Sequence, residues 1–176
     1  MTTTSNPFII PTFIFAGVAL KTADWAGESA DSAVGYLSAT IAGMLLGMLT
    51  SYGSDESSIV TGLILGVALA GKIDRPNLVF GVVVTAVTAL VAGFQTPRIW
   101  LLILVSTLSV VDEAGHDRAA TKSRPIGTFF RFRGSLKLAV LATGITSMVP
   151  LATVVGFLGF DIGYDAVDWV LEHRIK

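Results

Sequence analysis

The chain has 176 residues, of which 52% are hydrophobic and only 14% are charged. Soluble domains carry roughly 25% charged residues, and a mean hydropathy of +0.72 implies more apolar surface than one small core can bury. We therefore expect an integral membrane protein with a single transmembrane domain over residues 1–176. Twelve basic and thirteen acidic residues give no reason to expect nucleic acid as a partner. The absence of cysteine excludes disulfides, thiolate metal sites and dithiol redox chemistry.

The apolar segments predict an all-α, polytopic membrane bundle of about six transmembrane helices, because about 20 apolar residues in a helix cross a bilayer. The N-terminus lacks the basic region of a signal peptide, so we expect the first segment to be retained. Pro76 and Pro97 mark the starts of two segments, and Pro150 predicts a kink inside the last. The predicted spans cover residues 8–29, 33–52, 57–71, 77–94, 98–113 and 136–160, and an interfacial helix follows over 161–175.

The basic residues predict the orientation of the chain. Nine of the twelve Lys and Arg residues follow odd-numbered predicted spans, which places those connections in the cytoplasm. The basic loop 118–137 and the carboxylate clusters would then face the cytoplasm of a cell membrane. Both termini would lie outside if the sixth segment crosses once, whereas a re-entrant turn at Pro150 would return the C-terminus to the cytoplasm.

A charged stripe follows the first apolar segment. Lys21, Asp24, Glu28 and Asp31 stand at spacings of three, four and three, which puts them within roughly an 80° arc of one helix. Three carboxylates on one face repel each other unless a cation or a basic partner lies opposite. The stripe is therefore either a solvated helix end paired with loop arginines or a site for a hard metal ion.

A second cluster follows the fifth apolar segment, where Asp112, Glu113, His116 and Asp117 occur within six residues. Acid, His and acid at i, i+3 and i+4 is good spacing for metal ligands on one helix face. Charge at the end of a span is costly unless it is paired or functional. The alternatives are a metal site and a stop-transfer cap whose acids pair with Arg118, with His116 as an interfacial hydrogen-bonding residue.

Basic residues next to these acids suit phosphate. Lys72 and Arg75 lie within the tight turn 71–76, either as snorkelling anchors or as phosphate ligands. The loop 118–137 interleaves Lys and Arg with Phe129, Phe130 and Phe132, which suits anionic lipid head groups as well as a topology signal.

One short motif resembles a known family. Glu113-x-x-x-Asp117-Arg118, followed after five residues by Arg124-Pro125-Ile126, resembles the first aspartate-rich motif of UbiA-type membrane prenyltransferases over fourteen residues. In that family the acids hold magnesium on a polyprenyl pyrophosphate, so the resemblance implies Mg²⁺ and a phosphorylated isoprenoid. The sequence departs from the motif upstream, where the leading Asp and Asn of the family are missing, and a second acidic motif would have to come from residues 24–31.

These features predict a metal-dependent membrane enzyme that transfers or hydrolyses a phosphate ester of a phosphorylated lipid or isoprenoid. The alternatives are a divalent-cation transporter or channel and a non-catalytic subunit of a membrane complex. We expect catalysis by Glu113 and His116, and a divalent metal, Mg²⁺ in the first place with Mn²⁺ or Zn²⁺ as alternatives. The expected phosphate ligands are Lys72, Arg118 and Arg124, and the expected metal ligands are Asp24, Glu28, Asp31, Asp112 and Asp117.

Two stripes of small residues predict close helix contacts. They are Ala39-x-x-x-Gly43-x-x-x-Gly47 and Gly62-x-x-x-Gly66-x-x-x-Ala70. Such small-xxx-small faces let two helices approach closely. The contacts they make lie either within one chain or between the copies of a homo-oligomer.

Overall fold

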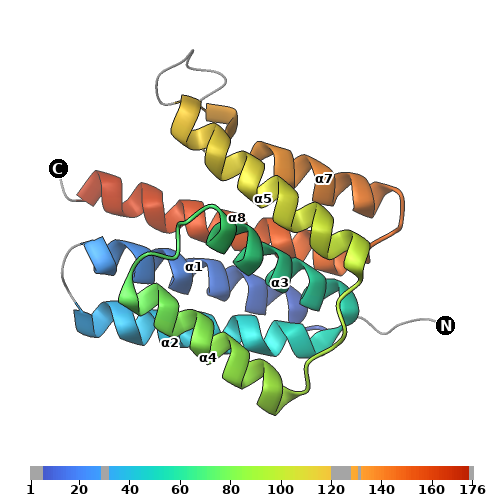
Figure 1. Ribbon diagram of the computed structural model, residues 1–176, viewed down its shortest axis with the longest axis horizontal. Coiled ribbons are helices and arrows are strands. Elements are labelled where there is room, and N and C mark those ends of the chain that lie inside the picture. The colour runs from blue at the N-terminus through green and yellow to red at the C-terminus, as the bar shows by residue number, and fades with distance from the viewer. Residues whose placement is uncertain (1–5, 29–31, 120–127, 131, 175–176) are drawn as a thin grey trace.

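The computed structural model describes residues 6–28, 32–119, 128–130 and 132–174. The elements of these residues are α-helices, shown in Figure 1: α1 (Ile9–Glu28), α2 (Ser32–Tyr52), α3 (Ser54–Leu69), α4 (Pro76–Ala92), α5 (Ile99–Ala119), α7 (Gly134–Ile145) and α8 (Leu151–Arg174). Three of the described helices contain a stretch long and apolar enough to cross a membrane, namely Ile9–Glu28, Ala33–Tyr52 and Ile99–Arg118. An all-helical membrane protein is therefore supported, whereas the expected number of six spans is not shown.

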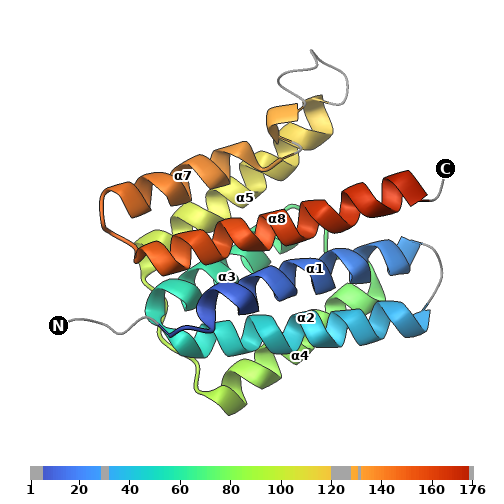
Figure 2. The same ribbon diagram turned by 180° about the vertical axis from the view of Figure 1, so that it is seen from behind.

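Consecutive helices run in opposite directions, so the bundle has two ends (Figures 1 and 2). The turn at Gly53 and the connections 93–98 and 146–150 lie at one end. We call the other one the charged end. It is formed by the ends of α1, α3, α5 and α8 and by the starts of α2, α4 and α7.

The expectation of one kinked span over 136–160 is wrong. α7 ends at Ile145, the chain turns back, and α8 starts at Leu151 and continues to Arg174, so residues 161–174 belong to α8 instead of a separate interfacial helix. Ser147 takes a left-handed backbone with φ 56°, and the amide of Met148 donates to the carbonyl of Thr143 at 2.9 Å. This turn is followed by Pro150, which lacks the amide donor that a continuous helix needs. The chain therefore turns back before Pro150, as the re-entrant alternative requires, while the side of the membrane on which the C-terminus lies stays a prediction.

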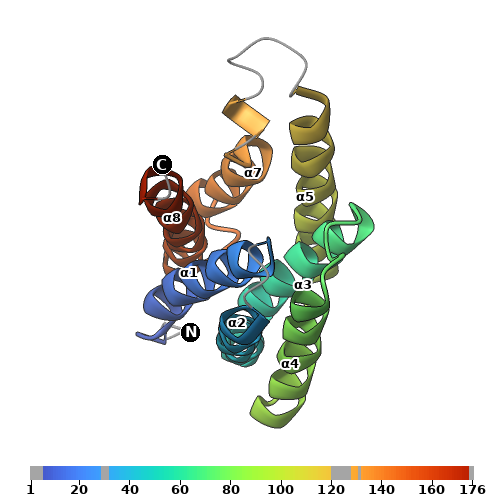
Figure 3. The ribbon, with the colours of Figure 1, turned by 90° about the vertical axis from the view of Figure 1, so that its left-hand side faces the viewer.

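Small residues let the helices pack closely. A Cβ at Gly17 of α1 would lie 2.0 Å from the carbonyl oxygen of Phe160 in α8. The two stripes of small residues pack within the chain: a Cβ at Gly43 would lie 2.5 Å from the carbonyl oxygen of Gly81, and one at Gly66 would lie 2.5 Å from Cβ of Ser109. α2 therefore packs on α4, and α3 packs on α5. Figure 3, which looks onto the charged end, shows α1 between α8 and α2.

The core lies between these helices and holds large side chains without solvent exposure, such as Phe13, Leu49, Ile59, Leu101 and Phe157. The outward face of α4 is different, because its apolar side chains are exposed. These include Val79, Val83, Val87 and Leu90. Such a face suits hydrocarbon better than water.

Buried polar contacts close the end opposite the charged end. Glu56 accepts a hydrogen bond from the Thr153 hydroxyl at 2.5 Å, which joins the start of α3 to α8. The Ser57 hydroxyl donates to the carbonyl of Gln95 at 2.7 Å, and the amide of Arg98 donates to Ser58 Oγ at 2.7 Å. The connection between α4 and α5 is thus held against the first turn of α3.

Candidate functional site

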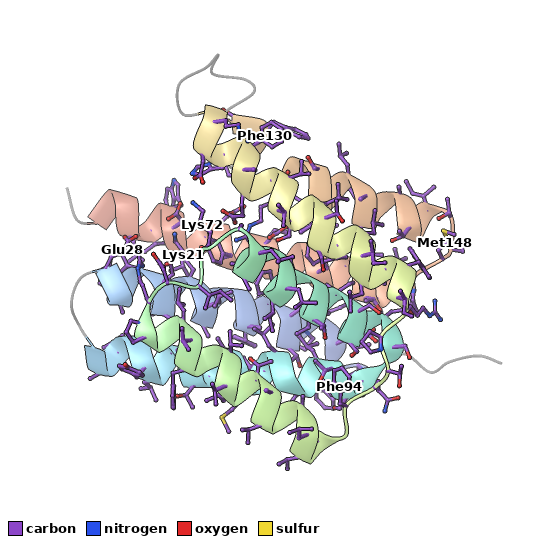
Figure 4. The ribbon with its side chains drawn as sticks, in the orientation of Figure 1. Lys21, Glu28, Lys72, Phe94, Phe130 and Met148 are labelled. Atoms are coloured by element: carbon purple, nitrogen blue, oxygen red, sulfur yellow. The ribbon has the colours of Figure 1, made fainter. Side chains whose placement is uncertain are left out.

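The described basic residues gather at the charged end. Lys21, Lys72, Arg75, Arg118, Arg133, Lys137 and Arg174 lie on segments that reach this end, and among the described residues Arg98 alone lies at the other. Figure 4 shows Lys21, Glu28 and Lys72 near the charged end, and Phe94 and Met148 far from it. The predicted phosphate ligand Arg124 lies outside the described residues.

The stripe on α1 is paired with a loop arginine. Arg75 Nη1 donates to the Asp24 carbonyl at 2.7 Å and to Asp24 Oδ1 at 2.9 Å, and Arg75 Nη2 donates to Glu28 Oε1 at 2.8 Å. The hydrogen bond to Glu28 is the main cause that raises the pKa of Arg75 above its ordinary value. Two predicted metal ligands are therefore paired with one guanidinium from the connection between α3 and α4, and Lys21 Nζ also lies 3.5 Å from Asp24 Oδ2. Asp31, the third acid of the stripe, lies outside the described residues.

Lys72 and Asp117 form a second bridge between segments. Lys72 Nζ donates to Asp117 Oδ1 at 2.8 Å, which links the connection after α3 to the last turn of α5. This hydrogen bond is the main cause that raises the pKa of Lys72. The two side chains are 38% and 56% exposed, so solvent screens the pair and it contributes little to stability. A ligand that offers Lys72 a better partner can therefore displace Asp117 at little cost.

Asp112 has a structural partner that the sequence did not reveal. Its residue is 1% exposed, and its two carboxylate oxygens accept the amides of Ser135 at 3.1 Å and Leu136 at 2.9 Å. These amides belong to the first turn of α7, where helices leave their donors unsatisfied. Asp112 therefore caps α7 from the neighbouring helix α5. Its predicted role as a metal ligand stays a prediction.

The two predicted catalytic residues lie on the last turns of α5. Glu113 Oε1 lies 3.6 Å from Nη2 of Arg133, the residue before α7, whose backbone is left-handed with φ 50°. The Arg133 guanidinium also lies over the ring of Tyr164 in α8, 5.0 Å from its centroid. His116 is exposed one turn further along α5, and Arg118 follows it in the same turn. Arg133 thus connects Glu113 to α8.

No group of three or more Asp, Glu or His among the described residues is placed to hold a metal ion. The described acids of the predicted metal set instead bind cations or, for Asp112, amides. Magnesium is commonly held by one or two carboxylates together with the phosphates of a substrate. The divalent metal expected from the sequence therefore stays a prediction.

Two cavities open near the charged end. The first, the apolar cavity, has a volume of about 470 Å³ and reaches between α2, α3 and α4, where Leu46, Leu63 and Val82 line it. Its mouth is lined by charged residues that include Glu28, Lys72 and Arg75. One cavity therefore joins a hydrocarbon-like interior to a charged rim.

The second, the polar cavity, has a volume of about 640 Å³ and lies among α1, α5, α7 and α8. Lys21, Lys137 and Asp161 line it together with aromatic side chains. Both cavities share four lining residues, which are Glu113, His116, Arg133 and Tyr164. The two residues predicted to be catalytic thus lie where the cavities adjoin.

The acids of α8 were predicted to belong to an interfacial helix over 161–175 and were not placed in the site. Asp161, Tyr164, Asp165 and Asp168 lie on one side of α8 and reach the charged end because the chain turns back before Pro150. Lys21 pairs with Asp168 at 2.9 Å across α1 and α8. Their spacing of three, four and seven residues was the available signal, since it aligns residues on one helix face.

Comparison with known proteins yields no relative: no protein-family model, no curated protein and no solved structure matches the chain significantly. The prenyltransferase resemblance stays confined to residues 113–126, of which the structure describes 113–119. There, Glu113 and Asp117 contact Arg133 and Lys72. The geometry and chemistry of the two cavities therefore provide the basis for a function.

Proposed function

We propose that this protein is a membrane enzyme for a phosphorylated lipid or isoprenoid, with metal-dependent transfer or hydrolysis at the phosphate ester. The observation that carries the proposal is the apolar cavity, whose interior suits a hydrocarbon chain and whose mouth holds Lys72 and Arg75. Ligand sites are typically apolar clefts with a few placed polar groups. A molecule with a phosphate head and an apolar tail complements both parts of this cavity at once.

The charged mouth suits a phosphate and a metal together. Lys72 and Arg75 now neutralise Asp117 and Glu28, each at 2.8 Å. A phosphate would compete for these cations through charge-assisted hydrogen bonds. The released carboxylates could then hold Mg²⁺ together with phosphate oxygens, which supplies charge neutralisation at the reacting phosphorus.

Glu113 and His116 are placed to move a proton. They line both cavities, so they would adjoin both a nucleophile in the polar cavity and a phosphate at the mouth of the apolar cavity. Either group could accept a proton from an attacking hydroxyl or water as a general base. Arg133, which contacts Glu113, would meet the same phosphate from the side of α7.

A cation transporter is less well supported by the same cavity. A conducting path needs polar ligands through the apolar layer. The deep lining of the apolar cavity is instead built from residues such as Leu46, Val60, Leu63 and Val82, with Thr85 as a polar member. The acids gather at its mouth, which favours a lipid chain over an ion in the interior.

We place the charged end in the cytoplasm. Seven of the eight Lys and Arg residues described in the structure lie on segments reaching this end. Positive residues next to spans are retained on the cytoplasmic side. The turn before Pro150 brings the end of α8 to this end as well. Arg174 thereby adds to the excess of basic residues at the charged end. The site would therefore meet its substrate from the cytoplasmic leaflet.

Filling the apolar cavity tests the proposal. Val82 lines the cavity, whereas its neighbour Val83 is 53% exposed on the outside of α4. Val82→Phe is expected to weaken binding of farnesyl phosphate about tenfold or more, since the ring occupies the space of the chain. Val83→Phe adds the same ring outside and should leave binding unchanged. Titration of purified protein in nanodiscs, followed by native mass spectrometry, gives both affinities.

Two comparisons make the result specific. Farnesol, which has the same chain without the phosphate, should bind more weakly than farnesyl phosphate. Product formed from farnesyl phosphate should appear with Mg²⁺ and disappear with EDTA. Equal affinities of the Val82→Phe and Val83→Phe variants, or equal binding of alcohol and phosphate, would contradict the proposal.

A further inference from the structure

We propose that the polar cavity binds a second substrate, a neutral molecule rich in hydroxyl groups, which accepts a phosphoryl group from the lipid. This inference rests on the proposed function and makes the reaction a transfer. The polar cavity is distinct from the apolar cavity except for a shared wall, formed by Glu113, His116, Arg133 and Tyr164. Its volume of about 640 Å³ lies within the range of small-molecule sites. It therefore has room for a second ligand while the lipid is bound.

An unsatisfied buried carboxylate points to the ligand. Asp161 lines the polar cavity and is 3% exposed, and its Oδ2 accepts no hydrogen bond from any residue that the structure describes. Arg133 Nη1 lies 3.8 Å from Oδ1, and Lys137 Nζ lies 3.7 Å from Oδ2, which are ion-pair distances beyond hydrogen-bond length. A buried polar atom without a partner is costly, so it calls for a donor that the protein does not supply.

The charges around Asp161 indicate a neutral donor. Arg133 and Lys137 already provide two positive charges next to it, so a third cation would be repelled. The lining as a whole carries five carboxylates against three Lys and Arg side chains, so a second anion is also disfavoured. A hydroxyl group donates a hydrogen bond without adding charge.

Further lining groups match a polyol. Asp165 Oδ2 lies 3.5 Å from Lys137 Nζ, a long contact that leaves lone pairs for other donors. The aromatic ring of Trp169 lines the same cavity and offers an apolar surface to the C–H face of a polyol. Acceptors and aromatic faces occur together, as a ligand with alternating hydroxyl and C–H groups requires.

The shared wall gives the reaction its geometry. A hydroxyl oxygen in the polar cavity attacks the lipid phosphorus at the wall formed by Glu113 and His116. A new P–O bond forms, and the bond from phosphorus to the lipid oxygen breaks with its electron pair on that oxygen. Glu113 takes the proton of the attacking hydroxyl and returns it to the leaving oxygen, so the products are a phosphorylated polyol and the lipid alcohol.

Binding to the polar cavity can be measured without lipid. Trp169 lines the cavity and is one of three tryptophans, so a chain with Trp25→Phe and Trp100→Phe reports on this cavity by fluorescence. We expect a saturable fluorescence change with myo-inositol. Asp161→Asn in this background should weaken inositol binding about tenfold, whereas Asp74→Asn, an exposed carboxylate outside this cavity, should not change it.

Other outcomes decide against the inference. No saturable response to inositol, or a response to ethanolamine or inorganic phosphate alone, would overturn it. Asp165→Asn removes a more exposed lining carboxylate and should weaken inositol binding several-fold, so the test remains usable if Asp161→Asn does not fold. Lipid binding is measured separately with the Val82→Phe and Val83→Phe variants. If inositol does not bind while lipid binding follows the expectation for these two variants, the acceptor site is refuted and the proposed function still stands.

Discussion

Replacing Gly17 with alanine is expected to destabilise the bundle by about 3 kcal/mol, at the upper end of overpacking effects. The added Cβ would lie 2.0 Å from the carbonyl oxygen and 2.9 Å from the carbonyl carbon of Phe160. Both atoms are backbone, so no rotamer change relieves the clash, and α1 and α8 must separate. The polar cavity lies between these helices, so the variant should also lose inositol binding. Thermal unfolding in a mild detergent measures the change.

Gly35→Ala is the matched control. A Cβ at Gly35 would meet the Asn77 side-chain nitrogen at 3.3 Å, a much milder contact with a side chain, although that nitrogen donates to the Ala23 carbonyl at 2.7 Å. Alanine is also a better helix former than glycine by about 1 kcal/mol. The control variant should therefore lose much less stability than Gly17→Ala. Equal melting temperatures of the Gly17→Ala and Gly35→Ala variants would contradict the close approach of α1 and α8.

Asp112→Ala is expected to lower stability by about 2–3 kcal/mol. The change leaves the amides of Ser135 and Leu136 without an acceptor, and buried donors that lose a charged partner carry a penalty of this size. Asp112→Asn keeps one acceptor oxygen and should cost less. Because the partners are amides, the loss should be the same in EDTA and in Mg²⁺.

A second acid on α5 separates this capping role from a general effect of charge. Asp117 is 56% exposed and pairs with Lys72 at the surface. Asp117→Ala should therefore change stability much less than Asp112→Ala does. A loss for Asp112→Ala that occurs only in the presence of Mg²⁺ would show that Asp112 is a metal ligand and would refute the cap.

The helices from α1 to α5 could be predicted from the sequence because their ends carry local signals. Pro76 lies at the start of α4, and the acids Asp55 and Glu56 lie in the first turn of α3. Apolar stretches of suitable length lie between these signals. The predicted boundaries over residues 8–113 accordingly lie close to the observed ones, with the largest difference at α5, which continues to Ala119.

The turn between α7 and α8 could not be predicted in the same way. A proline inside an apolar stretch can kink one helix or separate two. Here the chain separates into two helices because Ser147 has a left-handed backbone and the carbonyl of Thr143 accepts hydrogen bonds from the turn. No local sequence pattern predicts these features. This one turn determines on which side of the membrane the acids of α8 would lie.

The pairing within the site depends on helix packing, which spacing alone does not specify. The sequence placed Asp24, Glu28 and Asp117 on the correct helix ends but could not choose between ion pairs and a metal. Packing brings Arg75 to α1 and Lys72 to α5. In the proposed function, Lys72 and Arg75 would bind a phosphate, and the carboxylates that they now pair with would bind a metal.

We propose that the apolar cavity holds the chain of a phosphorylated lipid, and photolabelling can locate that chain. A farnesyl phosphate analogue with a diazirine at the far end of its chain is bound, irradiated and mapped by peptide mass spectrometry. We expect labels on lining residues such as Leu46, Leu63 and Thr85, competed by unlabelled farnesyl phosphate. Labels confined to exposed residues such as Val83 and Leu90, without competition, would contradict the claim.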